Sequence, residues 1–489
     1  MIFPSLDRVK AIAPGYDIVP VYMEILSDVR TPISVLKALK QVSSHTYLLE
    51  SADNSNHWGR YSFLGYDPKI ELFCKNHTMT IKDGTTRTFE CSDPAAEIRN
   101  ILSQYKSPRL EALPTFTGGF VGYFACEYIR YIEPTLDFPT PDDDSAMVND
   151  VDLMLFDKVI AFDHYKNKIY LIANISTNDL ERNYNKAELE LKALADLVVN
   201  GKEADIPKGI LKTEFTSEFT KDEFEAVVKK TQHYIKEGDI FQCVVSNRRE
   251  AEFDGSLLNA YRVLRTLNPS PYMFYLSGGD VELTGASPET LVKLTDGKMY
   301  TFPIAGTMRR GKTEAEDLAI EEKLINDEKE LAEHNMLVDL GRNDLGKISK
   351  FGSVKVEALH MLQRFSHVIH ITSTVSGDIQ DGKDALDAIG ATLPAGTLSG
   401  APKIRAIEIL HELEKSPRGV YGGAVGYIDF SGNMDVCIGI RMAMNKGGKV
   451  YVRAGAGIVR DSVPASEYNE TLIKGQSMIS AITDAQEVE

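Results

Sequence analysis

Short runs in which apolar and polar residues alternate dominate the first third of the chain and predict strands. Between residues 18 and 172 they include TYLLES, RYSFLGY, KIELFCK and NKIYLIANI, separated by turn residues. In TMTIKDGTTRTFE the alternation continues on both sides of Asp83 and Gly84, a pattern typical of a β-hairpin. We expect antiparallel sheet in this region, followed by a charged amphipathic helix over 178–197 and a polar connector over 203–216.

The rest of the chain mixes helical and strand patterns. Thr220 and Glu223 form a capping-box pattern before a helix that ends at Gly238, and residues 313–316 repeat that pattern before a long helix over 314–341. Strand runs such as DIFQCVVSNRREAEF and HVIHITSTVSGDI occur in groups, and three runs precede the last helix and end at AGAGIVRDS. Because strands are grouped and do not alternate strictly with helices, the pattern favours an α+β fold with large antiparallel sheets.

Length and charge limit the classes of function. The chain has 489 residues, which predicts two or three domains or one large fused unit. Its content of 43% hydrophobic and 26% charged residues is ordinary for a soluble globular protein. The formal net charge of -17 argues against a duplex nucleic-acid binder, because such binding requires clustered Lys and Arg. An anionic ligand therefore needs a local basic patch or a metal ion.

The cysteines and the N-terminus indicate a reducing compartment. Five cysteines lie far apart without a CxxC pair, so we expect buried thiols rather than a zinc site or disulfides. The N-terminus, MIFPSLDRVK, has no apolar signal-type segment, and no apolar run reaches the roughly 20 residues of a membrane span. These features predict a cytoplasmic protein. The cysteines are Cys74, Cys91, Cys126, Cys243 and Cys437.

Two pairs of glutamates lie on predicted helices. Glu330 and Glu333 are three residues apart, as are Glu467 and Glu470, and Lys474 follows one turn later. Residues at this spacing project from one face of a helix, and two such pairs supply the oxygen ligands that Mg2+ prefers. Exposed faces of acidic helices often carry the same spacing, so spacing alone leaves both interpretations open.

Two segments of small residues have the composition of anion-binding turns. PAGTLSGAPK, over 394–403, precedes a helix whose first backbone N–H groups favour a carboxylate. RAGAGIVRD contains Gly455, Ala456 and Gly457, whose small size lets a ligand approach the backbone. Ordinary tight turns are the alternative for both, and neither segment has P-loop or dinucleotide-binding spacing.

Isolated titratable residues in apolar segments are further candidates. His367 and His370 in FSHVIHITS are three apart on a strand and point to opposite faces, so at most one serves a given pocket. Glu289 follows a proline turn in GASPET, where a partly buried carboxyl with a raised pKa could donate a proton. A hydrogen-bonded core histidine and a helix-start acid are the alternatives. The sequence contains no G-x-S-x-G elbow and no glutaminase-type cysteine.

Nine motifs, in their order along the chain, resemble the chorismate-utilising enzymes, and among these the anthranilate synthases. They are IFQCVVSNRR, TGASPETL, FPIAGTMRRG, DEKELAEHNMLVDLGRNDL, HVIHITSTVSG, LPAGTLSGAPKIRA, GVYGGAVGYIDF, DVCIGIRMA and AGAGIVRDSVPASEYNET. The match covers residues 219–482, with a looser match before it. The resemblance implies an α+β fold whose large antiparallel sheets pack face to face and are flanked by helices. It also implies a regulatory-type region over 1–207 and a chorismate-binding catalytic region over 208–489.

The resemblance implies chorismate as the substrate and Mg2+ as the cofactor. Glu333 and Glu470 are implied as ligands of Mg2+, with Glu330 and Glu467 in support. An acidic protein then meets an anionic substrate through the metal ion. The residues implied to bind the substrate are Thr307, Thr397, Tyr421, Arg441, Gly455, Ala456, Gly457 and Lys474.

Four positions bear on the reaction. By resemblance, Glu289 protonates the departing C4 hydroxyl and His370 assists the later elimination. Where family members add water at C2, a lysine base stands at the position of Gln242; an amide cannot take a proton from water, but neutral ammonia needs no such base. Where members aminate C4, a lysine attacks the ring from the position of Ala305, which a methyl group cannot do. The resemblance therefore favours amination at C2, giving anthranilate and pyruvate.

The resemblance also implies two partners besides chorismate. A separate glutamine amidotransferase subunit supplies ammonia, so we expect a hetero-oligomer, with no nucleic acid or membrane partner. L-Tryptophan is implied as a feedback inhibitor; the alternative is that its contacts are core strand residues in a family member that has lost inhibition. An aminodeoxychorismate synthase component I and a non-catalytic tryptophan-binding subunit remain as alternatives. The residues implied to bind tryptophan are Glu50, Ser51, Pro271, Tyr272, Met273, Val425 and Tyr427.

Overall fold

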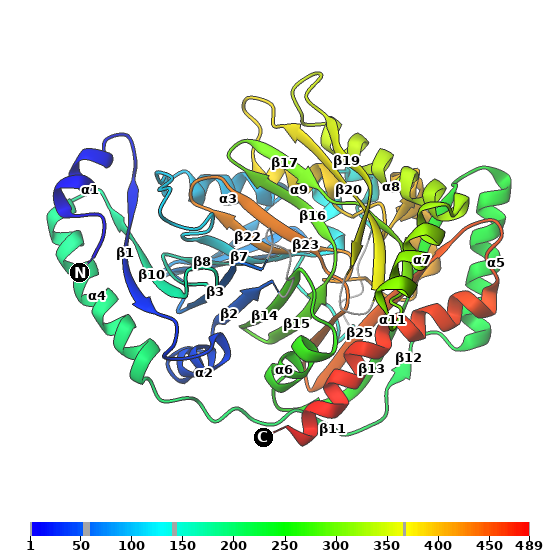
Figure 1. Ribbon diagram of the computed structural model, residues 1–489, viewed down its shortest axis with the longest axis horizontal. Helices are drawn as coiled ribbons and strands as arrows, with labels where there is room; N and C mark the ends of the chain where they lie inside the picture. The colour runs from blue at the N-terminus through cyan, green and yellow to red at the C-terminus, as the bar shows by residue number, and fades with distance from the viewer. Residues whose placement is uncertain (1, 52–58, 139–143, 365–367, 489) are drawn as a thin grey trace.

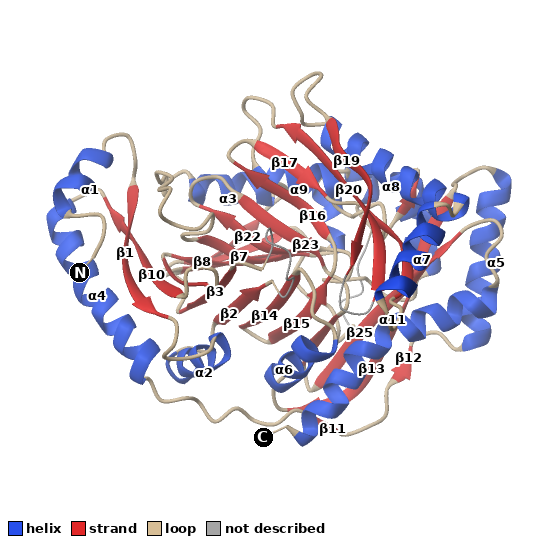
Figure 2. Ribbon diagram, in the orientation of Figure 1, coloured by secondary structure: helices blue, strands red, loops and turns tan. Residues whose placement is uncertain are grey.

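The computed structural model describes residues 2–51, 59–138, 144–364 and 368–488 of the chain. Its strands form two large sheets in the middle of the molecule, and helices lie around them (Figure 1). Figure 2 shows the same division between central strands and peripheral helices. Strand pairs within the described residues are antiparallel along both sheets. The α+β fold with large antiparallel sheets is confirmed.

The first sheet joins strands from both ends of the sequence. Two short strands, β12 (Thr216–Ser217) and β21 (Gly400–Ala401), pair with β13. The other strands, in spatial order, are β1 (Ile18–Leu26), β10 (Lys168–Ser176), β9 (Lys158–Asp163), β3 (Tyr61–Tyr66), β2 (Thr46–Glu50), β14 (Tyr272–Gly278), β15 (Val281–Ser287), β24 (Met442–Lys446), β25 (Lys449–Ile458), β13 (Gln242–Asp254) and β11 (Ile210–Leu211).

The second sheet is also built from both regions of the chain. Strand β19 (Lys355–Arg364) pairs with β20 at one end of it. The other strands, in spatial order, are β18 (Ile304–Arg309), β20 (Val368–Asp378), β17 (Lys298–Thr301), β16 (Thr290–Thr295), β23 (Met434–Ile438), β22 (Ala424–Asp429), β7 (Gly119–Phe124), β8 (Val151–Phe156), β4 (Ile70–Lys75), β5 (Thr78–Lys82) and β6 (Thr86–Glu90).

Helices cover the outer faces of the two sheets (Figure 1). Helices α2 (Pro32–Val42), α4 (Leu180–Asn200), α6 (Leu258–Leu267) and α11 (Pro464–Asp484) share one core with the first sheet. Helices α3 (Pro94–Leu102), α8 (Glu328–Gly346) and α9 (Ala385–Thr392) share another with the second sheet. The remaining helices are α1 (Leu6–Ile12), α5 (Lys221–Glu237), α7 (Glu314–Ile325), α10 (Lys403–Leu413) and the short η1 (Cys126–Tyr131), η2 (Pro134–Leu136) and η3 (Ala485–Glu487).

A third core lies between the sheets. Phe63 and Phe274 of the first sheet pack in the same cluster as Phe156, Val425 and Tyr427 of the second. Apolar residues on facing sheet surfaces interdigitate in this way when two sheets pack face to face. The order of layers is therefore helices, sheet, sheet, helices, as the sequence resemblance implied.

The regions 1–207 and 208–489 do not form separate sheets. Strand β2 of the first region lies beside β14 of the second in one sheet, and β7 lies beside β22 in the other. The division of the chain into a regulatory and a catalytic region stays a prediction about function. None of the described helices is long and apolar enough to cross a membrane. All five cysteines are buried and unpaired.

Most local predictions are confirmed. The hairpin at Asp83 joins β5 to β6, and Thr220 forms the expected capping box with Glu223 at the start of α5. The prediction of a single helix over 314–341 is wrong. The side chain of Asp327 accepts hydrogen bonds from backbone N–H groups and so caps the start of a new helix, α8. The sequence predicts three strand runs before the last helix, whereas the structure has β22, β23, β24 and β25 there, because the run DVCIGIRMA contributes to both β23 and β24, which belong to different sheets.

Candidate active site

Two short crossovers between the sheets place candidate residues side by side. The chain passes from β15 to β16 through Pro288 and Glu289, and it returns from β23 to β24 through residues 439–441. The crossovers are hydrogen-bonded to each other, since Ile438 N–H donates to the carbonyl of Glu289 at 3.0 Å and Ala286 N–H donates to that of Arg441 at 3.0 Å. Arg441 has a positive φ of 51°, which is uncommon for a residue with a side chain and marks the sharp change of direction.

Glu289 has the environment of a proton donor. Its Oε1 accepts a hydrogen bond from Thr397 Oγ1 at 3.0 Å. Burial raises the pKa of this carboxyl to about 7, although the hydrogen bond from Thr397 and the charge of Lys474 oppose the rise. A small cavity of ≈ 40 Å³ adjoins Glu289 and Thr397 and is also lined by Leu337 and Leu340 of α8. At neutral pH the carboxyl exchanges its proton readily, as general acid catalysis requires.

Lys474 lies between Glu289, the acidic turn of α11 at Glu470, and the small-residue segment 455–457 of β25, here called the glycine strand. Its Nζ lies 2.6 Å from Glu470 Oε1, one turn earlier on α11. The same ammonium donates to the carbonyl of Gly455 on β25 at 3.3 Å. Three sites that the sequence placed far apart, at Glu289, Gly455 and Glu470, therefore converge on one cation.

The glycine strand leaves room beside the chain. A methyl group at Gly455 would lie 2.7 Å from the hydroxyl of Tyr421, so only glycine allows that approach. A methyl group at Gly457 would meet nothing within 4 Å, and Gly457 is exposed. The side chain of Ala456 is buried in the core, so this residue can present only its backbone to a ligand. The strand thus has open space at Gly457 and a phenol hydroxyl at Gly455.

Burial keeps His370 neutral near pH 7. Burial lowers the pKa of its imidazole, the charge of Arg441 lowers it further, and a hydrogen bond to Gly306 opposes them. With Nδ1 donating to the carbonyl of Gly306 at 3.1 Å, the lone pair of the neutral ring is on Nε2. Burial also lowers the pKa of Arg441, whose guanidinium lies near Tyr421. His367 lies outside the described residues.

The two positions that bear on the attacking group lie on different sheets. Ala305 is buried in β18, next to a bulge at Gly306, which has a positive φ of 63°. Gln242 is buried at the start of β13 and pairs with Ala401. Ala401 belongs to the segment PAGTLSGAPK, residues 394–403, here called the anion-type turn. Thr307 pairs with His370 through the backbone, and its side chain lies outside the described part of the chain.

The two glutamate pairs lie on helices α8 and α11, one pair on each. The pKa of Glu330 is raised by burial and by Glu333, and that of Glu467 by burial and by Glu470. The positive charge of Lys329 on α8 lowers the pKa of Glu467 on α11, so these two helix turns lie near each other. The described residues contain no group of three or more His, Cys, Asp and Glu that could hold a metal ion. Two carboxylates with substrate and water nevertheless suffice for Mg2+, and the paired carboxylates fit such a hard cation by their chemistry.

The predicted tryptophan residues gather where β2, β14 and β22 meet. Glu50 is buried and accepts hydrogen bonds from Ser62 Oγ at 3.0 Å and Tyr261 OH at 2.6 Å, and it forms an ion pair with Arg265 at 2.9 Å. Its partner in the strand register is Met273. Glu50 therefore anchors the sheet, and its internal bonds occupy its carboxylate.

Other members of that set line the space between the sheets. Tyr272 OH donates to Asp435 at 2.7 Å, and Asp435 pairs with Tyr427 across β22 and β23. The ring of Tyr427 lies 4.3 Å from that of Phe116. Ser51 has a buried hydroxyl without a hydrogen-bond partner in the described residues. Pro271 directly precedes β14, and Val425 is buried in the inter-sheet core.

Sequence reasoning missed one buried ion pair beside the site. Arg418 and Glu414 lie 2.7 Å apart and are almost fully buried. Their only sequence signal is the arginine in SPRGVYGG, three residues before Tyr421. Because the pair is almost fully buried, the charge of Arg418 does not serve to keep the protein soluble.

A model of the chorismate binding enzyme family matches residues 45–480. The chain belongs to this family of chorismate-binding enzymes. Anthranilate synthase component 1 of Acetivibrio thermocellus is 44% identical over 498 residues, with 100% of both chains covered. Anthranilate synthase component 1 of Aquifex aeolicus is 43% identical and covers 99% of this chain and 98% of its own.

Solved structures agree with this assignment. The crystal structure of anthranilate synthase component I from Streptococcus pneumoniae is 36% identical, with a TM-score of 0.74 over 93% of this chain and 98% of that chain. The menaquinone-specific isochorismate synthase from Escherichia coli has a TM-score of 0.70 at 17% identity and covers 98% of this chain and 99% of its own. The second likeness shows the fold alone.

Proposed function

We propose that the chain is the large, chorismate-aminating component of an anthranilate synthase. The observation that carries the proposal is the set of contacts around Glu289, where a carboxyl with a pKa of about 7 meets Thr397 and lies near Lys474. The names of relatives that are 43–44% identical over essentially the whole chain support the same activity. Its product would be the first intermediate committed to tryptophan biosynthesis.

In the proposed reaction, Tyr421, Arg441 and the backbone of the glycine strand bind the enolpyruvyl carboxylate of chorismate. Arg441 is suited to this role because it is partly buried, so a carboxylate at its guanidinium competes with less water than at the surface. The missing side chain at Gly457 lets the carboxylate approach backbone N–H groups. The ring then lies between Glu289 and His370.

Ammonia attacks C2 while the C4 hydroxyl departs. The nitrogen lone pair forms the new bond, both ring double bonds shift, and Glu289 donates the proton with which the C4 hydroxyl leaves as water. The added nitrogen then releases its extra proton, which restores the amine. In the second step the C2–H bond breaks and its electron pair makes the ring aromatic as the C3–O bond breaks. The released enolpyruvate takes up a proton at its methylene carbon and becomes pyruvate, so the proton lost from C2 is balanced. Neutral His370, placed beside Arg441, assists this elimination.

The residues at two positions exclude the neighbouring reactions of the family. Gln242 has no basic nitrogen with which to activate water. Ala305 has no nucleophile that could form a covalent bond to the ring. Ammonia is therefore the group that adds, and C2 is the carbon that receives it.

The glutamate pairs of α8 and α11 would hold one Mg2+, with Glu333 and Glu470 as ligands and Glu330 and Glu467 in support. The ion supplies positive charge for the ring carboxylate of the substrate. Lys474 neutralises part of this acidic cluster through its contact with Glu470. Burial raises the pKa of Glu330 and of Glu467, the neighbouring carboxylates add to the rise, and a bound cation would oppose it.

A glutamine amidotransferase subunit would supply the ammonia, giving a hetero-oligomer. The five cysteines are all buried, and burial raises the pKa of each thiol, so none has the environment of a reactive thiolate. Free ammonia is scarce near neutral pH, so the chain alone works only when ammonium is added in excess.

L-Tryptophan would act as a feedback inhibitor between the sheets. The buried hydroxyl of Ser51 has no partner among the described residues and suits the amino or carboxylate group of an amino acid. The aromatic side chains of Phe116 and Tyr427 provide surfaces for an indole ring.

The test uses the purified chain with chorismate, Mg2+ and either ammonium at alkaline pH or glutamine, and it follows anthranilate fluorescence. We expect activity with ammonium and none with glutamine. Equal activity with both would contradict the need for a separate amidotransferase. Formation of the 4-amino isomer would identify an aminodeoxychorismate synthase, and no turnover with any nitrogen source would identify a non-catalytic binding subunit.

A further inference from the structure

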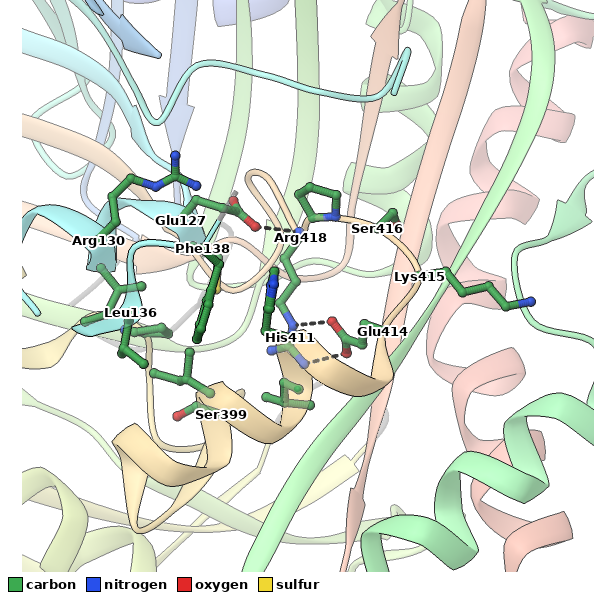
Figure 3. Close-up of a pocket in the computed structure, with 16 residues that line it drawn as sticks. Glu127, Arg130, Leu136, Phe138, Ser399, His411, Glu414, Lys415, Ser416 and Arg418 are labelled. Carbon is green, nitrogen blue, oxygen red and sulfur yellow. Dashed lines mark hydrogen bonds and ion pairs between the residues drawn. The ribbon is translucent and has the colours of Figure 1, made fainter. Parts of the chain in front are cut away.

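Arg418 joins three segments behind the candidate site. Figure 3 shows its side chain between Glu414 and Glu127 at the edge of a cavity of ≈ 170 Å³, with Phe138 and His411 stacked on the other side. The guanidinium makes two hydrogen bonds to Glu414, from Nε at 2.8 Å and from Nη2 at 2.7 Å. Its remaining contacts are to backbone carbonyls, which a solubilising surface arginine would not need.

The backbone contacts fasten the anion-type turn to the first sheet. Arg418 Nη1 donates to the carbonyl of Leu398, in the turn between α9 and α10. Arg418 Nη2 donates to the carbonyl of Val244 in β13 at 2.6 Å. The same Val244 donates its N–H to Ser399 of the turn at 2.9 Å. One planar side chain thus spans the turn and the strand.

The turn that Arg418 holds carries the partner of the acid. Thr397 directly precedes Leu398, and its hydroxyl is the donor to Glu289. On the other side, the ring centre of Tyr421 lies 5.8 Å from the guanidinium carbon of Arg418, and Tyr421 N–H donates to the Arg418 carbonyl at 3.3 Å. Two residues assigned to substrate contact, Thr397 and Tyr421, therefore depend on Arg418 for their position.

Two buried carboxylates hold Arg418 itself. Glu414 also accepts hydrogen bonds from the backbone N–H and the hydroxyl of Ser246, each at 2.8 Å. Glu127, from η1 in the N-terminal region, accepts hydrogen bonds from the backbone N–H of Arg418 at 2.6 Å and from that of Gly419 at 3.0 Å. Apolar residues of similar volume often stabilise a core as well as a buried ion pair does, so stability alone gives no reason for this one.

We propose that Arg418 is a positioning residue for the amination of chorismate, which holds the Thr397 turn against Glu289 and holds Tyr421 against the glycine strand. The inference rests on the proposed function. The planar fork of the guanidinium is what reaches two carbonyls and one carboxylate together, and a lysine ammonium has no such geometry. Glu127 makes the N-terminal region part of the same support.

The test compares Arg418→Lys with Thr397→Val. Removing the hydrogen bond from Thr397 raises the pKa of Glu289, because that bond, with the charge of Lys474, opposes the effect of burial. Both variants should therefore shift the alkaline limb of the pH profile of kcat/KM to higher pH, and the double variant should shift it no further. Displacing the turn should also lower kcat/KM in Arg418→Lys by about 10- to 100-fold. Arg405→Lys is the matched control, at a partly exposed arginine of α10 that pairs with Asp239 and Glu408, and it should change neither the pH profile nor kcat/KM.

A direct titration separates this inference from the proposed function. The carboxyl of Glu289, identified by its absence in Glu289→Gln, is followed by 13C NMR of protein with labelled glutamate, which needs no turnover. A higher pKa of Glu289 in Arg418→Lys supports the inference, and an unchanged pKa overturns it even if activity falls. If Arg418→Lys does not fold, Glu127→Gln takes its place: a smaller rise supports the inference and no rise overturns it. Wild-type protein that titrates as expected but never turns over chorismate would contradict only the proposed function.

Discussion

Replacing Glu289 by glutamine should lower turnover and at the same time stabilise the fold. The amide keeps the size of the side chain and still accepts the hydrogen bond from Thr397, but it has no acidic proton. General acid catalysis contributes typically about 10²–10⁴-fold, so kcat should fall by about that factor. A carboxyl whose pKa rises from 4.5 to about 7 on folding costs about 3 kcal/mol to keep ionised in the folded protein.

The stability difference should depend on pH in one direction only. Below pH 4.5 the carboxyl of Glu289 is protonated in both the folded and the unfolded state and contributes no difference. Between pH 4.5 and about 7 the unfolded chain releases the proton first, so the wild-type protein loses stability as pH rises. The glutamine variant should therefore exceed the wild type in free energy of unfolding by up to about 3 kcal/mol above pH 7.

Urea unfolding at several pH values measures the stability, and anthranilate fluorescence measures turnover. The concentration of free ammonia is kept constant, because ammonium loses its proton as pH rises. Asp152→Asn is the control, since burial also raises the pKa of this carboxyl, to about 6, outside the site. A glutamine variant with nearly wild-type kcat, or a stability difference that stays constant with pH, would refute the reasoning about Glu289.

Three further predictions concern Ala305, the proposed Mg2+ site and the proposed tryptophan site. Ala305→Lys places a long amine in a buried position and should lower anthranilate formation at least about tenfold; an unchanged rate and product, by chromatography, would show that Ala305 does not face the ring. Chelation of Mg2+ should abolish activity. Glu333→Gln and Glu470→Gln should each raise the Mg2+ concentration for half-maximal activity about tenfold or more. The exposed control Glu322→Gln should leave that concentration unchanged. Ser51→Ala should raise the tryptophan concentration for half-inhibition about 2- to 10-fold without changing kcat; unchanged inhibition would exclude its hydroxyl as a contact.

Features that depend on neighbours in the chain could be predicted from the sequence. The capping box of Thr220 and the hairpin at Asp83 are set by residues a few positions away, and both are present. Glu289 could be singled out as a candidate for a similar reason, since the proline turn before it is a local signal. The break before α8 was missed because Asp327 lies inside an otherwise continuous helical pattern, and only the side-chain bond to the backbone reveals it as a cap.

Contacts between distant segments could not be predicted in the same way. Arg418 bonds to Val244 and Leu398, which are 174 and 20 residues away, and nothing in its local sequence specifies these partners. The passage of DVCIGIRMA from one sheet to the other was missed because a strand pattern does not state which sheet a strand joins. The sequence therefore shows each motif separately, whereas only the three-dimensional structure shows that the motifs meet at Lys474.

The two crossovers beside the acid are so short that they act as tethers. Between Ser287 and Thr290 the chain spans at most about 11 Å, and facing sheets lie about 10 Å apart, so this connection has almost no slack. The return through Arg441 is only one residue longer and is hydrogen-bonded to the first. A ligand that wedged the sheets apart near Tyr427 would therefore pull on Glu289 and Arg441, so the distance between the sheets would act directly on the proposed acid.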